Sequence, residues 1–318
     1  MFSTAFKVSF QAVIQIILLG FIGYILVRRK MFNEEGLSIL SKFIIEVSLP
    51  LLIFTQLIKD FSFTLYPNWW LFSLWGVLVS LFGLILGLIF VGLIKELDRK
   101  LQFLSLITFQ NSGYLPLVLV NTILPKEKQG ILFIYIFLFL LGFNLLIWSL
   151  GTFMLNFTGR KRFVLGSLFS PPVIATSVSL LCIFFGLHKF FPEFLFKPLK
   201  MIGDCTLPLA IIVIGGNLAQ IKSDLVEFRY IIFIIILKLM IMPLVCLYLI
   251  LRFHFDYFLG LLILLQLSMP SAVSLSLILN YYKKKDYLIS QGIFFTHLVG
   301  ILSIALFLSL YFTLKGLP

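Results

Sequence analysis

KFIIEVSLPL, at residues 42–51, returns 158 residues later as KMIGDCTLPL, at residues 200–209. A lysine, an acidic residue, a small hydroxyl residue and a proline stand at matching positions: Lys42, Glu46, Ser48 and Pro50 in the first copy, and Lys200, Asp204, Thr206 and Pro208 in the second. The chain has 318 residues, so this offset is close to half of its length. The pattern predicts two units of similar build, residues 1–158 and residues 159–318.

The composition of the chain is typical of a protein that spans a membrane. Hydrophobic residues make up 61% and charged residues 12%, whereas soluble domains are about half apolar and about a quarter charged. The apolar runs, of about 18–25 residues, are long enough to cross a bilayer as helices, and they are continuous, unlike the alternating strands of a membrane barrel. We therefore expect an all-α protein in the plasma membrane, whose first apolar run is retained as a helix and is not a signal peptide.

Several other classes of protein are not expected. The net charge of +12 comes from basic residues in short loops between apolar runs, so no nucleic-acid partner is predicted. Cys182, Cys205 and Cys246 stand in apolar surroundings as buried thiols, and the three histidines share no metal-ligand spacing. The sequence contains no phosphate-binding loop, metalloprotease motif or nucleophile elbow. Neither a cofactor, a metal ion nor an enzymatic activity is expected.

Ten apolar segments are expected to span the membrane. They lie near residues 8–27, 39–58, 69–94, 101–123 and 131–155 in the first half, and near 171–188, 200–219, 230–251, 257–281 and 287–314 in the second. Loops on one side carry fifteen of the 25 lysine and arginine residues and the other side carries nine, which makes the first side cytoplasmic and places both termini outside. Because five is an odd number, the second half enters the membrane in the opposite sense, which makes an inverted repeat typical of secondary transporters.

Two of these segments carry a break near their middle. The fourth contains Gln110-Asn111-Ser112-Gly113-Tyr114-Leu115-Pro116, and the ninth contains Gln266-Leu267-Ser268-Met269-Pro270-Ser271. Proline lacks an N–H and clashes with the carbonyl four residues back, so Pro116 is expected to free the carbonyl of Ser112 and Pro270 that of Gln266. Ser112 and Pro270 are 158 residues apart, so the breaks correspond. Symmetric breaks indicate a substrate site, and the helix N-termini there favour an anion.

Other polar residues in the apolar segments leave two interpretations open. Lys238, about eight residues into the eighth segment, either attracts an anion or extends to the cytoplasmic surface. The pairs Lys42–Glu46 and Lys200–Asp204 either couple transport to a cation or brace helix starts near the membrane interface, which is the favoured interpretation. The residues that either line the site or bond a neighbouring helix are Asn144, Thr296 and His297.

Short motifs along nearly the whole chain resemble the auxin efflux carrier family, which includes bacterial malate and malonate permeases and plant auxin transporters. The matching pieces are Gly20-Phe21-Ile22-Gly23-Tyr24, Arg28-Arg29-Lys30, Ser48-Leu49-Pro50, Asn111 to Pro116, Leu207-Pro208-Leu209, Gly215-Gly216-Asn217-Leu218-Ala219, Lys238 to Pro243, Met269-Pro270-Ser271-Ala272, Asn280-Tyr281-Tyr282, Asp286, Ser290 and Thr296. The resemblance implies ten helices in two inverted repeats of five, a fold similar to that of bile-acid symporters, in which the broken fourth and ninth helices cross. It also implies a scaffold of the first, second, sixth and seventh helices and a transport domain of the rest. Plant members carry Asn-Pro at the first break, where this chain has Asn111-Ser112, which argues against auxin as the substrate.

These observations predict a secondary active transporter that moves a small organic anion, a mono- or dicarboxylate, by alternating access. The predicted substrate site consists of Asn111, Ser112, Gly113, Ser268, Met269, Pro270 and Ser271, with Lys238 as a second charge. The coupling ion is left open between a proton and sodium, and a homodimer through the scaffold helices is a further expectation besides contact with the lipid bilayer. Two alternatives stay open: a membrane sensor of the same fold that binds its ligand without moving it, and a membrane-embedded enzyme.

Overall fold

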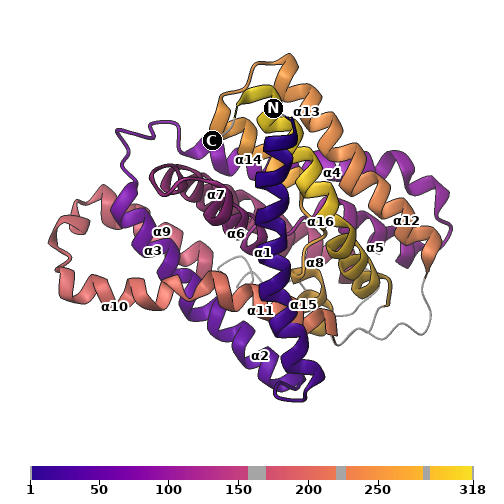
Figure 1. The fold of residues 1–318 in the computed structure, drawn as a ribbon, viewed down its shortest axis with the longest axis horizontal. Coiled ribbons are helices and arrows are strands. Elements are labelled where there is room, and N and C mark those ends of the chain that lie inside the picture. The colour runs from indigo at the N-terminus through magenta and orange to yellow at the C-terminus, as the bar shows by residue number, and fades with distance from the viewer. Residues whose placement is uncertain (1, 157–169, 220–226, 282–286, 317–318) are drawn as a thin grey trace.

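The computed structural model describes residues 2–156, 170–219, 227–281 and 287–316 of the chain. The described residues are largely helical and contain no strand beyond one isolated bridge, which confirms the expected all-α class (Figure 1). Some of the basic loop residues that support the predicted orientation, namely Arg160, Lys161, Arg162, Lys222 and Lys283 to Lys285, lie outside the described residues. The placement of both termini outside the cell therefore stays a prediction.

The helices follow the apolar segments. In the first half they are α1 (Phe2–Arg28), α2 (Glu34–Phe43), α3 (Leu49–Asp60), α4 (Trp70–Phe90), α5 (Leu97–Thr108), α6 (Tyr114–Ile123), α7 (Lys126–Leu146) and α8 (Thr152–Asn156). In the second half they are α9 (Pro171–Phe184), α10 (Glu193–Asp204), α11 (Thr206–Ala219), α12 (Phe228–Ile236), α13 (Met242–Arg252), α14 (Tyr257–Ser268), α15 (Ser274–Tyr281) and α16 (Tyr287–Lys315). Turns of π-helix join α2 to α3 as η1 (Ile44–Ser48), α7 to α8 as η3 (Ile147–Gly151) and α12 to α13 as η6 (Leu237–Ile241). Short 3₁₀ turns are η2 (Val91–Leu93) and η5 (Leu187–Phe190).

Several helical runs are long and apolar enough to cross a membrane. Among the described residues there are 7 of them: Ser9–Arg28, Glu35–Asp60, Trp70–Leu93, Lys126–Leu155, Glu193–Asn217, Phe228–Arg252 and Leu288–Lys315. The apolar helices α6, α9 and α14 are shorter, at 10–17 residues. The chain is thus a multi-pass membrane protein, while the arrangement of ten spans as two inverted repeats stays a prediction.

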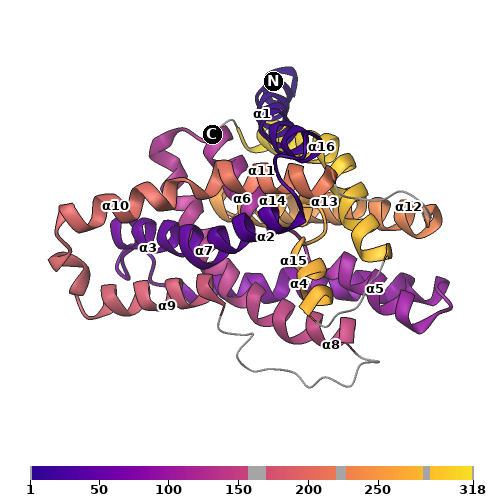
Figure 2. The same ribbon diagram turned by 90° about the horizontal axis from the view of Figure 1, so that it is seen from below.

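Helices α1 and α11 come into backbone contact through glycines. A Cβ atom added to Gly215 would lie 1.8 Å from the carbonyl oxygen of Gly20, and one added to Gly23 would lie 1.9 Å from that of Ile212. Small residues at such positions allow membrane helices to approach closely. As a result, α1 lies along one face of the molecule, packed on α11 and beside α16 (Figures 1 and 2).

Replacing Gly215 with alanine should destabilise the protein by roughly 3 kcal/mol or more. The added methyl group would meet the carbonyl of Gly20, a backbone atom that moves only if α1 moves with it. Thermal unfolding of the purified protein in detergent measures the effect. Gly92→Ala is the matched control, because a Cβ at Gly92 would meet nothing within 4 Å. Unchanged unfolding of Gly215→Ala would show that α1 and α11 are not in close contact.

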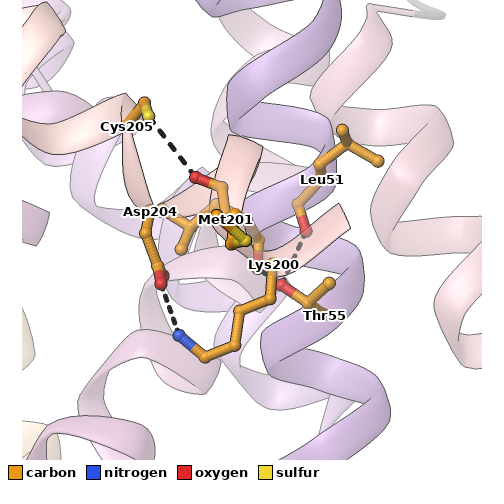
Figure 3. Close-up of polar contacts among 7 residues, drawn as sticks. Leu51, Thr55, Lys200, Met201, Asp204 and Cys205 are labelled. Atoms are coloured by element: carbon orange, nitrogen blue, oxygen red, sulfur yellow. Dashed lines mark hydrogen bonds and ion pairs between the residues drawn. The ribbon is translucent and has the colours of Figure 1, made fainter. Parts of the chain in front are cut away.

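The two copies of the repeated segment meet in the structure. Ser48, at the end of η1, and Thr206, at the start of α11, are both fully buried, and their hydroxyl oxygens lie 2.5 Å apart. In the preceding helix α10, which packs beside α3, Lys200 Nζ lies 2.6 Å from Asp204 Oδ2 (Figure 3). Cys205, between α10 and α11, donates from Sγ to the carbonyl oxygen of Met201 at 3.4 Å. This thiol is exposed, whereas the sequence predicted a buried one.

Of the two pairs interpreted as matching braces at helix starts, Lys200–Asp204 forms its ion pair and Lys42–Glu46 does not, and neither lies at the start of its helical run. Ion pairs between described residues include none between Lys42 and Glu46. Glu46 lies in the π-turn η1, whose wider turn removes the stacking of residues four apart on an α-helix. Asp204 ends the α-helix α10, and both acids lie well inside the long runs Glu35–Asp60 and Glu193–Asn217.

The helices that flank the two breaks contain continuous runs of buried residues. Every residue is buried from Gly260 to Ser268 in α14, from Gln102 to Thr108 in α5 and from Leu115 to Val120 in α6. Figure 2 shows α6 and α14 at the centre of the view, with other helices above and below them. The segments that interrupt these helices are therefore enclosed by protein, where irregular backbone is tolerated at membrane depth.

Candidate functional site

The two helix breaks meet and pair through their backbones. We name residues 109–113, between α5 and α6, the first break, and residues 269–273, between α14 and α15, the second break. An isolated antiparallel bridge joins them, in which Asn111 N donates to the carbonyl oxygen of Pro270 at 2.8 Å. We call this meeting point the crossing. Each break lies near the middle of its helical run, as expected from the sequence.

Unwinding at the first break removes the amide donors that the last carbonyls of α5 would have in a continuous helix. Groups from the second break replace some of them. Ser271 Oγ donates to the carbonyl oxygen of Leu106 at 2.8 Å, and Ala272 N donates to that of Phe109 at 3.0 Å. The crossing is therefore held by hydrogen bonds between the two halves of the chain.

The two prolines act differently. The carbonyl of Ser112, which Pro116 was expected to free, accepts a hydrogen bond from Gln266 Nε2 at 3.2 Å, in agreement with the prediction. The carbonyl of Gln266, expected to be freed by Pro270, instead accepts from Met269 N at 3.4 Å. That expectation is corrected, because the amide of Met269, one residue before the proline, closes a tighter turn at the end of α14.

Lys238 is fully buried in the π-turn η6 and reaches the end of α5. Its Nζ donates to the carbonyl oxygen of Ile107 at 2.6 Å, an acceptor that Asn111 N would occupy if the helix continued. The interpretation that Lys238 extends to the cytoplasmic surface is therefore wrong. No carboxylate of the described residues lies within ion-pair distance of it. A buried cation without a counter-charge is costly, and an anion held nearby would compensate it.

Two adjacent residues of α16 each hold one of the breaks. Thr296 Oγ1 accepts from Ser271 N at 3.2 Å, and His297 Nε2 lies 3.2 Å from Asn111 Nδ2. Both α16 side chains are buried. Of the two interpretations left open by the sequence, these contacts favour a position at the site over a bond to an unrelated helix. No hydrogen bond of the described residues joins the side chain of Asn144 to the crossing.

Four fully buried side chains at the crossing have polar atoms without a hydrogen-bond partner in the described chain. They are Thr108 Oγ1, Gln110 Oε1 and Nε2, Gln266 Oε1 and Ser268 Oγ. Buried polar groups nearly always have partners, and an unsatisfied one costs about 1–3 kcal/mol. Thr108 and Gln266 are 158 residues apart, and so are Gln110 and Ser268, which is the offset of the repeat. Both halves thus offer donors and acceptors to a polar ligand.

All the residues predicted for the site lie at or beside the crossing. Asn111, Ser112 and Gly113 belong to the first break, Met269, Pro270 and Ser271 to the second, Ser268 ends α14, and Lys238 contacts the end of α5. The prediction missed the side chains of Thr108, Gln110 and Gln266. The sequence could have indicated them, because each is a polar residue at the end of an apolar helix or in a break, at positions related by the repeat.

The crossing carries hydroxyl, amide, imidazole and ammonium groups. Among the described residues, no group of three His, Cys, Asp or Glu side chains is placed to hold a metal ion. Uncharged donors and acceptors beside one buried amine are groups of the kind that orient small polar ligands in protein sites. Helix α6 adds hydrogen-bond donors and partial positive charge to the crossing. It begins at the first break without a side-chain cap, so its first amide N–H groups and the positive end of its dipole lie there.

Comparison with known proteins gives consistent results. The family described as "Membrane transport protein" matches two segments, residues 8–164 and residues 158–308. An uncharacterized transporter of Methanocaldococcus jannaschii is 26% identical over 305 residues, which cover 94% of this chain and 97% of the relative. The matches extend over both halves and include both breaks.

Proposed function

The chain belongs to the membrane transport protein family, and from that premise we propose that it is a secondary active transporter for a small organic anion. The family match confirms the resemblance to the auxin efflux carriers and points to a transporter instead of an enzyme. In the proposal a mono- or dicarboxylate binds at the crossing and crosses the plasma membrane by alternating access.

One observation carries the proposal: the crossing combines unpartnered buried polar atoms with a buried amine. The free atoms belong to Thr108, Gln110, Gln266 and Ser268, and the amine, which a bound anion would hold in its charged form, is that of Lys238. A carboxylate would accept hydrogen bonds from the hydroxyl and amide donors, and such charge-assisted bonds are about twice as strong as neutral ones. It would also supply the negative charge that Lys238 lacks among the described residues.

The arrangement of ten spans in two inverted repeats is part of the proposal. The pairing at the crossing supports it. Shifting the bridged residues Gln110 and Ser271 by the offset of 158 gives Ser268 and Gly113, which lie in the same antiparallel register. Exchange of the two halves therefore maps the crossing onto itself, which is what inverted repeats produce. The contact of Ser48 with Thr206, also 158 residues apart, fits the same symmetry.

The proposed movement divides the molecule into a scaffold and a transport domain. The scaffold would consist of α1, α2, α3, α9, α10 and α11, and the transport domain would contain the crossing.

The homodimer through the scaffold stays a prediction. The half-exposed Lys200–Asp204 pair of α10 lies inside a long apolar run, where contact of charged groups with lipid is costly. A second copy packed on this face would shield the pair from lipid. Light scattering of the purified protein measures the oligomeric state and should give a dimer.

Uptake into proteoliposomes tests the proposed function. Purified protein should take up at least one of four radiolabelled probes, lactate, malonate, malate and succinate, in a saturable manner and without ATP. Protein-free liposomes are the blank. The sensor alternative predicts that a carboxylate raises the unfolding temperature although none is moved. If no probe is either moved or bound, the assignment to organic anions is wrong.

A further inference from the structure

His297 is a buried titratable side chain in direct contact with the first break. It lies on α16 with 8% of its surface exposed, and its Nε2 is 3.2 Å from Nδ2 of Asn111. The preceding residue, Thr296, accepts a hydrogen bond from the backbone of Ser271 in the second break at 3.2 Å. One turn of α16 is therefore joined to both sides of the crossing.

The surroundings decide which ring nitrogen of neutral His297 carries the proton. Nδ1 lies 2.8 Å from the carbonyl oxygen of Ile293. A carbonyl can only accept, so Nδ1 carries the hydrogen and Nε2 has a free lone pair. Asn111 donates to that lone pair through Nδ2. Neutral His297 thus holds the amino group of Asn111 toward itself, and the side-chain oxygen of Asn111 is directed away from the ring.

Protonation of His297 reverses this arrangement. Nε2 gains a hydrogen and becomes a donor, so it can no longer face the amino group of Asn111. The amide must turn until its oxygen accepts from Nε2, and its amino group then faces away from the ring, where it can donate to a carboxylate. The imidazolium also adds positive charge. A bound anion therefore favours the protonated ring, and by reciprocity the protonated ring favours the anion.

Few charged groups reach this part of α16 from the elements packed against it. Lys238 of η6 is the buried one, and an anion near both groups would be attracted by both charges. The remaining titratable groups of these elements lie toward the ends of neighbouring helices, along α13 or in the last turns of α16: Lys7, Tyr24, Arg28, Asp98, Arg99, Lys100, Arg229, Tyr230, Cys246, Tyr248, Arg252, Tyr257, Tyr311 and Lys315. The hydrogen-bond partners of the ring among the described residues are Asn111 and Ile293.

We propose that His297 binds one proton together with each substrate anion and thereby couples transport to the proton gradient. The inference rests on the proposed function, because it assigns the coupling ion of the same site. The proton enters from the side of higher proton concentration, stays on Nε2 while the anion is bound and is released with it on the other side. When His297 is protonated, the side-chain amide of Asn111 turns, and its amino group can then donate to the anion.

Accumulation against a gradient tests the proposal. Proteoliposomes clamped at zero membrane potential are given an inward proton gradient of one pH unit, with malonate, malate and succinate as probes. One proton per anion corresponds to about tenfold accumulation by the wild type, since one pH unit equals a factor of ten in proton concentration. His297→Gln cannot carry the proton, so its internal and external concentrations should become about equal. Its exchange of labelled for unlabelled carboxylate requires no net proton movement and should persist at a reduced rate, because the anion loses the charge of the imidazolium. His254→Gln, at an exposed position between α13 and α14, is the matched control and should accumulate like the wild type.

The outcomes separate this proposal from the proposed function. Equal accumulation by His297→Gln and the wild type, or wild-type flux that ignores the proton gradient, would overturn the coupling role and leave the transporter in place. Loss of exchange in both His297→Gln and His297→Asn would also overturn it, because His297 would then shape the site without carrying a proton. No flux by the wild type of any of the four probes, lactate included, would overturn the proposed function itself.

Discussion

Carboxylate uptake should fall about ten- to hundredfold when Asn111 is replaced with alanine. A hydrogen bond to a charged group contributes about 1.5–3 kcal/mol, and about 1.4 kcal/mol corresponds to a factor of ten. Asn111 is proposed to make such a bond to the substrate, and its backbone already pairs with Pro270. The side chain can therefore be removed while the bridge between the breaks remains. Initial uptake rates in proteoliposomes measure the effect.

Asn121→Ala is the matched control, because Asn121 is an exposed asparagine in α6, on the same helix run as Asn111. It should transport like the wild type. Ser268→Ala is a companion variant: its hydroxyl has no partner in the described chain, so its loss should reduce uptake without lowering the unfolding temperature. Ser271→Ala is less informative, since Ser271 Oγ also bonds the carbonyl of Leu106. Normal uptake by Asn111→Ala would place the substrate elsewhere.

Replacing Lys238 with methionine should reduce uptake more than about a hundredfold and leave the unfolding temperature unchanged or raised. Transport is lost because the anion loses its buried counter-charge. Stability is preserved because an unpaired buried ammonium is costly, and an apolar side chain of similar length fills its place. The two readouts, initial uptake and thermal unfolding, are measured on the same preparation.

The opposite changes in activity and stability distinguish this role from a structural one. Lys238 donates to the carbonyl of Ile107, so a purely structural lysine would lower the unfolding temperature when replaced. Lys59→Met is the control, since Lys59 is exposed at the end of α3. If Lys238→Met transported normally, or lost stability and transport together, Lys238 would have no specific part in anion binding.

The sequence indicated the breaks because proline and glycine act locally. Pro116, Pro270 and Gly113 identify them through the missing N–H and the missing side chain. The start of the first break was not predictable in the same way. α5 ends at Thr108, well before Pro116, because the amide of Asn111 bonds a carbonyl far away in the chain. Tertiary hydrogen bonds of this kind leave no pattern in a local window of sequence.

The repeated segment also contains a structural difference that the sequence does not show. Lys42–Glu46 and Lys200–Asp204 have the same spacing, yet only the second pair forms an ion pair among the described residues. A π-turn in the first copy changes the side-chain directions, whereas Lys200 and Asp204 both lie in the α-helix α10. The sequence pattern carries the spacing but not the local winding of the helix.

The candidate site was predicted in its backbone more completely than in its side chains. Motif matching selected the residues in and beside the breaks, and the structure brings them together. The contact of His297 with Asn111 and the orientation of Lys238 toward Ile107 depend on how α16 and η6 pack on α5. Packing between distant helices determines such contacts, and the sequence alone left both residues with two interpretations.

Counterflow tests the central claim most directly. Proteoliposomes loaded with unlabelled lactate, malonate, malate or succinate are diluted into a trace of the same labelled compound, and internal label is followed over time. For at least one of these anions, the account predicts a transient accumulation of label with the wild type and with Asn121→Ala, and almost none with Asn111→Ala. Equal accumulation in all three proteins would contradict the site at the crossing, and no accumulation with any anion would contradict the transporter itself.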